Sequence, residues 1–262
     1  MRALRLSVGL LTIIPVGAIG DVDRRLARSA ILLAPLVGLL LGALGAVVLV
    51  GVHALVPSTL GSLLAAVLAI ASIAYLTRAL HLDGLADTAD ALGSGKEAAA
   101  ALEIARRGDV GPFGVVTVVL VLLVQVTALA MAADAGTGAL ALVIALVTGR
   151  VAIVIACARG IRAARPEGLG ALVAGTVPRV AAATWALAAI IGVAVIGTRL
   201  AGVAGAVTLA TSVTIGLIVA VALVHRAVRR LGGITGDVLG AAAEMTATAA
   251  LVLVAVGTTV SA

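Results

Sequence analysis

Residues 113–133 read FGVVTVVLVLLVQVTALAMAA, a stretch without a single charged side chain. About 20 apolar residues in an α-helix cross the ~30 Å hydrocarbon core of a bilayer, at about 1.5 Å per residue. A helix is the expected conformation, because a backbone in hydrocarbon must satisfy its own hydrogen bonds. The stretch therefore predicts a transmembrane helix at Phe113–Ala133, and similar runs occur on both sides of it.

Seven runs of this kind predict the fold class. The composition agrees, since 63% of the residues are hydrophobic and 11% are charged, against about a quarter charged in soluble domains. We expect a single all-α domain over residues 1–262, a polytopic integral membrane protein with about seven transmembrane helices in a lipid bilayer. The predicted spans are Ser29–Val56, Leu60–Leu80, Phe113–Ala133, Ala139–Ala158, Val180–Thr198, Gly202–Val224 and Val238–Val260.

The first twenty residues need a separate interpretation. Arg2 and Arg5 precede an apolar stretch that Pro15 interrupts, and Arg24 and Arg25 follow it closely. A cleaved signal peptide has an unbroken apolar core, and positive charges behind the core resist export. We therefore expect an N-terminal interfacial or re-entrant helix.

The segments between the spans differ in charge. Sixteen of the 18 basic residues lie in the N-terminal segment and in the loops after the second, fourth and sixth spans. Basic segments stay on the cytoplasmic side, so we expect the N-terminus and these loops in the cytoplasm of a prokaryotic cell, with the protein in its plasma membrane. The chain has one Phe, one Trp and one Tyr, so no nucleic-acid binding by stacking is expected. The sequence is compatible with a homo-oligomer and does not decide the oligomeric state.

The acidic residues are concentrated in the segment HLDGLADTAD, residues 81–90. Asp83, Asp87 and Asp90 are spaced i, i+4 and i+7, which puts them on one stripe of a helix. Their mutual repulsion predicts a divalent cation between them, and hard oxygen ligands favour Mg²⁺, with Mn²⁺ as an alternative. A solvated helix face is the other interpretation, but no basic residue lies between Arg78 and Lys96 to neutralise the stripe. His81 is expected to point away from the aspartates.

Two further segments carry polar groups beside glycines. The segment LEIARRGDVGPFG, residues 102–114, and the segment LGGITGDVLGAAAE, residues 231–244, supply guanidiniums, carboxylates and a hydroxyl. Guanidinium groups match phosphate oxygens. Two charged residues, Arg150 and Glu244, lie inside predicted spans, where a buried charge needs a partner. We expect these two side chains to pair or to line one polar cavity.

These motifs, together with Leu11–Val16, Ala34–Gly42 and Glu167–Gly170, resemble the cobalamin synthase family, adenosylcobinamide-GDP ribazoletransferase, in order along the whole chain. One stretch departs from the family pattern. Many members have basic–Asp–Ser–Arg where this chain has Arg106-Arg107-Gly108-Asp109, so acid and base have exchanged places at Arg107 and Asp109. The resemblance implies transfer of α-ribazole, or its 5′-phosphate, onto adenosylcobinamide-GDP, with release of GMP and formation of adenosylcobalamin or its 5′-phosphate.

The resemblance and the residue chemistry together give a set of expected roles. Asp83, Asp87 and Asp90 are expected to bind Mg²⁺, and Asp83, Asp87 and Glu244 are the candidate catalytic groups, with Asp87 or Glu244 as the base. The residues expected to bind substrate are Arg106, Arg107, Asp109, Arg150, Thr235 and Asp237.

Three other functions use acidic motifs in membrane proteins. A CDP-alcohol phosphotransferase needs Ala-Arg after its Asp-Gly-x-x, but Asp87 follows Asp83-Gly84-Leu85-Ala86 here. A prenyltransferase and a cation-coupled transporter are further alternatives. A transporter places polar residues near the middle of several spans, whereas those of this chain gather at predicted span ends.

Overall fold

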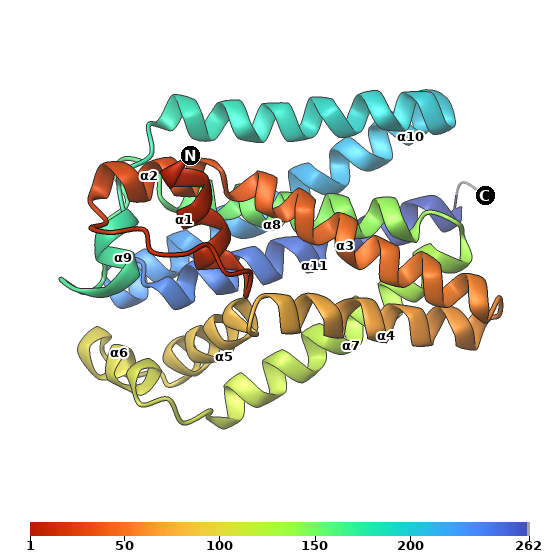
Figure 1. The fold of residues 1–262 in the computed structure, drawn as a ribbon. Helices are drawn as coiled ribbons and strands as arrows, with labels where there is room; N and C mark the ends of the chain where they lie inside the picture. Colours follow the sequence, from red (N-terminus) through yellow and green to blue (C-terminus); the bar gives the residue numbers. More distant parts are fainter. Residues whose placement is uncertain (261–262) are drawn as a thin grey trace.

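The computed structural model describes residues 1–260 and is helical throughout that range, apart from loops and two isolated bridges. Figure 1 labels the helices in chain order. They are α1 Arg2–Leu11, α2 Arg24–Leu32, α3 Ala34–Leu55, α4 Thr59–Leu76, α5 Leu80–Gly93, α6 Ala98–Arg106, α7 Pro112–Asp134, α8 Gly138–Ala156, α9 Gly168–Val173, α10 Arg179–Leu231 and α11 Gly236–Val260.

Within the described residues, α3, α4, α7, α8, α10 and α11 are long and apolar enough to cross a membrane. The 53 residues of α10 correspond to about 80 Å, more than twice the hydrocarbon thickness. Ala201 and Gly202 have non-helical dihedral angles and divide α10. Figure 1 shows the helix running out along the bundle and folding back. With α10 counted as two segments, the seven predicted spans are all present, and the all-α polytopic membrane fold is confirmed.

Two predicted boundaries were wrong. The first span does not begin at Ser29, because α2 is a separate helix and α3 begins at Ala34. Pro35 stands in the first turn of α3, where its missing N–H is tolerated, and it cannot continue a helix arriving from α2. The second span ends at Leu76 rather than Leu80, because Arg78 and Ala79 both have positive φ, of 54° and 53°.

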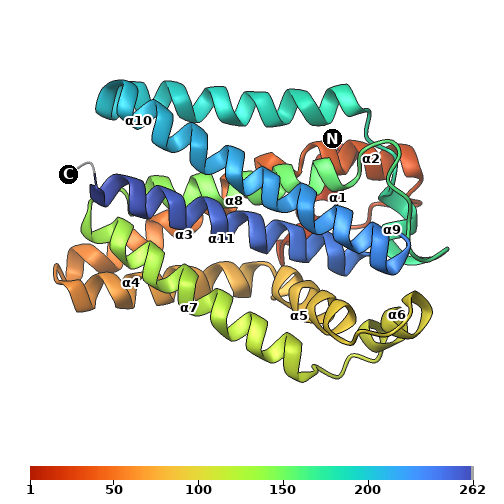
Figure 2. The same cartoon turned by 180° about the vertical axis from the view of Figure 1, so that it is seen from behind.

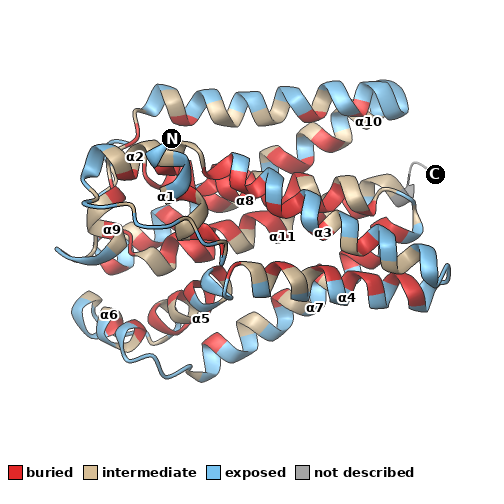
Figure 3. Ribbon diagram, in the orientation of Figure 1, coloured by how far each residue is buried: buried red, intermediate tan, exposed pale blue. Residues whose placement is uncertain are grey.

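The core of the bundle is built by α8 and α11. In both helices 72% of the span is buried inside the protein, compared with 33–39% in the other spans. Gly149 of α8 permits their close approach, since a Cβ there would lie 2.6 Å from the Ala243 carbonyl oxygen. Figure 3 shows buried residues along both helices and mainly exposed ones on the first half of α10. The exposed side chains of that half are apolar, as in Leu187 and Ile191, and suit contact with lipid.

The short helices α1, α2, α5, α6 and α9 gather at one end of the bundle (Figures 1 and 2). The ten residues of α1 are too few to cross a membrane, as expected for a non-spanning N-terminal helix. Arg78, at the break before α5, donates to the Gly9 carbonyl oxygen at 3.3 Å. Arg24 of α2 donates to the carbonyl oxygens of Ala171 and Ala174 in α9 and just after it. The first contact fixes α1 beside the start of α5, and the second fixes α9 to α2.

Candidate active site

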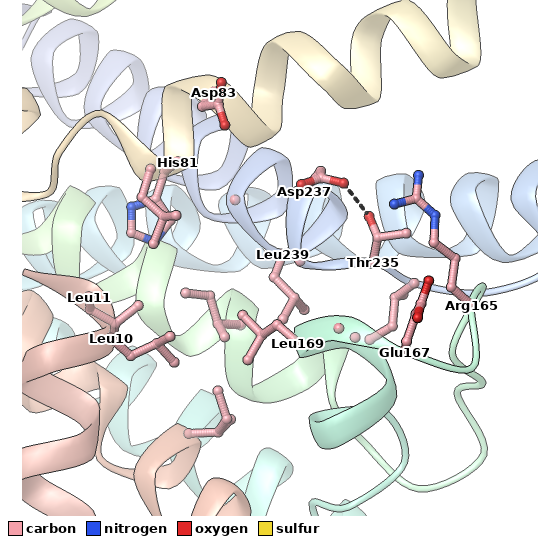
Figure 4. Close-up of a pocket in the computed structure, with 18 residues that line it drawn as sticks. Leu10, Leu11, His81, Asp83, Arg165, Glu167, Leu169, Thr235, Asp237 and Leu239 are labelled. Atoms are coloured by element: carbon pink, nitrogen blue, oxygen red, sulfur yellow. Dashed lines mark hydrogen bonds between the residues drawn. The ribbon is translucent and has the colours of Figure 1, made fainter. Parts of the chain in front are cut away.

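A cavity of about 310 Å³ opens at this end, between α1, α5, α9 and the first turns of α11. Figure 4 shows its two kinds of wall. The polar side chains that line it are His81, Asp83, Arg165, Glu167, Thr235 and Asp237. The aliphatic side chains on the other wall include Leu10, Leu11, Ile31, Ile153, Leu169 and Leu239. Three of the predicted site residues, Asp83, Thr235 and Asp237, therefore share one cavity.

Close backbone packing places Asp83 beside Asp237. A Cβ on Gly84 of α5 would lie 2.8 Å from the Asp237 carbonyl oxygen, and a Cβ on Gly240 of α11 would lie 3.1 Å from the His81 Cα. Glycine at both positions lets the two helices approach without side chains between them. As a result, the most specific motif on α5 and the glycine-rich motif before α11 present their carboxylates to the same space (Figure 4).

Negative charge is concentrated around this contact. Burial, followed by the charges of Asp83, Asp237 and Asp90, raises the pKa of Asp87 to about 6, and the guanidinium of Arg165 partly opposes the shift. Asp87 itself does not line the cavity. A cluster of carboxylates facing one guanidinium favours binding of a cation or of a protonated group.

The residues can be compared with the needs of a Mg²⁺ ion. Within the described residues no three His, Cys, Asp or Glu side chains are grouped closely enough to hold an ion by themselves. Mg²⁺ is commonly held by one or two carboxylates together with waters and substrate phosphates. The Asp83 and Asp237 carboxylates at one cavity, with Asp87 behind them, fit an ion that binds together with a phosphate group.

Asp90 is not brought to the cavity with the other two aspartates of the stripe. Its two carboxylate oxygens accept hydrogen bonds from the backbone N–H groups of Gly111 at 2.7 Å and Gly114 at 2.9 Å. These amides lie at the beginning of α7, where N–H groups lack intrahelical partners and the helix dipole favours a negative charge. In the structure the expected three-aspartate set is therefore divided, and Asp90 caps α7.

A loop that the sequence did not single out completes the polar wall. The Ala164 N–H donates to the Ile234 carbonyl oxygen, and the Ile234 N–H donates to the Arg162 carbonyl oxygen, both at 2.9 Å. This pairing holds the loop after α8 against the segment before α11. It brings Arg165 and Glu167 to the cavity.

In the sequence, Arg165 was only one of the basic residues that indicate the membrane topology. Glu167 entered only through the family motif, which was the one signal pointing to it. Thr235, opposite them, caps α11: its hydroxyl accepts from the Val238 N–H at 3.3 Å and donates to the Asp237 Oδ2 at 3.0 Å.

The expected phosphate-binding residues after α6 are only partly brought to the site. Arg106 lies 4.0 Å from Glu167, with both side chains largely exposed, so it reaches the rim. Arg107 and Asp109 are exposed and do not line the cavity. Exposed ion pairs contribute little stability, and the contact of Arg106 with Glu167 serves to place a guanidinium near the opening.

Arg150 and Glu244 do not form the expected ion pair within the described residues, although the charge of Glu244 still acts on the Arg150 guanidinium. The Arg150 Nη2 lies 3.5 Å from the His81 Nδ1, whereas the Glu244 Oε2 accepts a hydrogen bond from the Gln125 Nε2 at 3.0 Å. Arg150 on α8 faces α5, while Glu244 on α11 faces α7. Glu244 lines a second cavity of about 40 Å³ with Thr77 and Gln125. Neither charged residue lines the main cavity.

His81 was expected to point away from the aspartates, yet it lines the same cavity as Asp83. The helix α5 begins at Leu80, so both residues belong to its first turn. The cavity lies around that turn (Figure 4). His81 and Asp83 point in different directions around the helix axis, yet both line the cavity.

The fold and the site define a class: a helical membrane protein with a carboxylate-rich cavity at one end of its bundle, suited to group transfer. A family model described as cobalamin-5-phosphate synthase matches residues 3–255. An adenosylcobinamide-GDP ribazoletransferase of Frankia casuarinae is 40% identical over 97% of this chain and 95% of its own length. Proteins of the same name from Nocardioides sp. and Bradyrhizobium diazoefficiens are 43% and 36% identical, over 95% and 96% of this chain and 96% and 92% of their own lengths.

No solved structure matches the chain. The match over nearly all of its length shows that the protein belongs to the cobalamin-5-phosphate synthase family. It is an enzyme, a transferase of the membrane.

Proposed function

We propose that this enzyme joins adenosylcobinamide-GDP to α-ribazole, or to α-ribazole 5′-phosphate, in the assembly of the nucleotide loop of cobalamin. The names of its relatives support these substrates. The observation that carries the proposal is the meeting of Asp83 and Asp237 at one cavity beside Arg165. Carboxylates that can hold a cation, with a guanidinium next to them, are the groups that transfer of a phosphoryl centre requires.

The reaction forms one bond and breaks one. A ribose hydroxyl oxygen of α-ribazole attacks the phosphorus atom on the cobinamide side, the bond from that phosphorus to the bridging oxygen breaks, and GMP leaves. The hydroxyl proton passes to a carboxylate. Asp87, whose pKa is raised to about 6, exchanges protons near neutral pH more readily than an ordinary aspartate, but it does not line the cavity and would take the proton through a bridging water. Glu244, the other candidate base, lies at the second cavity.

Mg²⁺ is the proposed cofactor, with Mn²⁺ as an alternative. Asp83 and Asp237 would hold it, and Asp87 would add negative charge behind them. Bound there, the ion would neutralise charge on the pyrophosphate and on the transferred phosphoryl group. Arg165, on the same polar wall, is placed to bind phosphate oxygens.

The cavity end of the bundle is proposed to face the cytoplasm of a prokaryotic cell, because it carries nearly all the basic residues. Accessibility of single cysteines tests this in a Cys157→Ala background. Lys96→Cys, at the cavity end, should react with an impermeant thiol reagent only after the cells are opened. Arg199→Cys, near the α10 break, should react in intact cells. The reverse pattern would contradict the orientation.

The activity is tested by turnover of adenosylcobinamide-GDP and α-ribazole by the purified protein in lipid, with Mg²⁺ or with a chelator. Metal-dependent release of GMP together with a cobalamin product is expected. Asp83→Asn should abolish the product, whereas Glu97→Gln, an exposed carboxylate at the start of α6, should retain it. Wild-type protein that is folded and binds Mg²⁺ but releases no GMP would contradict the proposed function.

A further inference from the structure

The cavity has an aliphatic part and a polar part, and Leu80 and Ile234 are the apolar residues that directly adjoin polar ones in the chain. Figure 4 shows Leu10, Leu11, Leu169 and Leu239 gathered together, apart from Arg165 and the carboxylates. The aliphatic wall draws on α1, α2, α8, α9 and α11, none of which supplies a polar side chain to it other than those at the start of α11. Such a cavity is complementary to a ligand with one flat apolar part and one hydroxylated part.

The size of the cavity separates the two proposed substrates. α-Ribazole has about twenty non-hydrogen atoms and occupies roughly 300 Å³ at the packing density of organic crystals, close to the 310 Å³ of the cavity. Adenosylcobinamide-GDP is far larger: it has on the order of a hundred non-hydrogen atoms more than a cavity of this volume can hold at the same packing density. We therefore infer that the corrinoid stays outside, while its pyrophosphate approaches Asp83, Asp237 and Arg165 through the opening.

We propose that this cavity is the nucleoside subsite, with the apolar benzimidazole base of α-ribazole against the leucine wall and its ribose hydroxyls beside Asp83 and Asp237. The inference rests on the proposed function and adds the location and orientation of one substrate. The base is held mainly by apolar contact with the leucines. The hydroxyls then lie where a carboxylate can accept the proton of the attacking oxygen.

The end of α1 forms part of the proposed nucleoside subsite. Leu10 and Leu11 end α1 and form part of the wall. The Ile13 N–H donates to the Leu76 carbonyl oxygen at 2.7 Å, and Arg78 donates to Gly9. The end of α1 is thus fixed to the break between α4 and α5, and it covers the base from the side opposite the aspartates.

Two half-buried wall residues, Leu10 and Leu169, allow a test that leaves the packed core unchanged. Leu10→Gln and Leu169→Gln should each weaken binding of α-ribazole on the order of tenfold, because a polar amide replaces apolar contact. The KM for adenosylcobinamide-GDP should stay unchanged. Leu4→Gln, on the exposed side of the same helix α1, is the matched control and should bind α-ribazole like the wild type.

Binding of α-ribazole alone, followed by its fluorescence in lipid nanodiscs, is measured beside steady-state turnover. Loss of the two ring methyl groups, in benzimidazole riboside, should weaken binding by a further factor of roughly ten. Unchanged α-ribazole affinity in both leucine variants, or a raised KM for the corrinoid instead, would overturn the subsite while turnover by the wild type upholds the proposed function. Absence of turnover by the wild type counts against the function itself. Retained thermal unfolding temperatures of the variants show that they fold.

Discussion

The Arg150 Nη2 lies 3.5 Å from the Nδ1 of His81, and the Nε and Nη1 of the same guanidinium have no hydrogen-bond partner among residues 1–260. Arg150 is 1% exposed and His81 2%. A guanidinium has only donors, so the His81 Nδ1 accepts and the ring proton is assigned to Nε2. Burial, and then the charge of Arg150, hold the pKa of His81 well below its usual range. We therefore expect His81 to be neutral and to act as an N–H donor rather than as the base of the site.

The donor role of His81 predicts different effects for two amide substitutions. His81→Gln can place an N–H near the position of Nε2, whereas the shorter Asn cannot reach it. We expect His81→Asn to lower kcat/KM by about ten- to a hundredfold, as for a lost hydrogen bond to a charged group, and His81→Gln to lower it only a few-fold. Equal losses in both variants, measured in steady-state assays, would speak for a base at this position.

Arg150→Met separates activity from stability. A buried cation without a carboxylate partner is costly, and an apolar side chain of similar volume is often neutral or stabilising. We expect the variant to unfold at the same or a higher temperature in detergent. Its kcat/KM should fall, because His81 loses the contact that orients its ring, and Arg150→Lys should recover part of it. A lower unfolding temperature in Arg150→Met would show that the guanidinium is mainly structural.

Asp90→Ala tests the division of the aspartate stripe. Losing the cap of α7 should lower the free energy of unfolding by about 1–2 kcal/mol and should speed proteolysis of the loop 107–111. Mg²⁺ affinity should change little, whereas Asp83→Asn should lose it. Titration of Mg²⁺ by calorimetry, with both variants at equal folded fraction, decides between the roles. A loss of Mg²⁺ affinity in Asp90→Ala as large as in Asp83→Asn would show that Asp90 also binds Mg²⁺.

Proton and cation should compete at Asp87. Its pKa is raised from 3.8 to about 6 in the folded, metal-free protein, so the folded state holds this proton more tightly than the unfolded state. The resulting stabilisation is present below about pH 4 and is lost as the pH rises through 6. Conversely, the Mg²⁺ concentration for half-maximal activity should increase as the pH falls through 6. Asp87→Asn should remove that pH dependence, and a dependence unchanged in the variant would contradict the assignment.

Hydropathy predicted the spans because lipid selects length and apolar composition, which are both local properties. The end of α4 could not be predicted in this way. Arg78 and Ala79 have a left-handed backbone, which non-glycine residues seldom adopt. No sequence pattern predicts it here. The sequence placed Arg150 and Glu244 inside spans, where α8 and α11 hold them, but the direction of each side chain was not predictable.

The candidate site was predictable where one helix determines it. The spacing of Asp83, Asp87 and Asp90 predicted a shared stripe on α5, and the helix is there. Which neighbour each carboxylate meets depends on tertiary packing: Asp90 meets the beginning of α7, and Asp83 meets Asp237. Arg165 lies on a loop held by backbone pairing with Ile234, a contact between residues far apart in sequence that periodicity does not reveal.

The contact of Gly84 with the backbone of Asp237 joins a short helix to the end of a transmembrane one. Long spans respond to a thinner or thicker bilayer by tilting, and a change in the tilt of α11 displaces Asp237 at its end. The helix α5 has no span of its own to follow that movement. We therefore expect the spacing of the two carboxylates to depend partly on the length of the surrounding acyl chains, and the catalytic rate to depend on lipid composition.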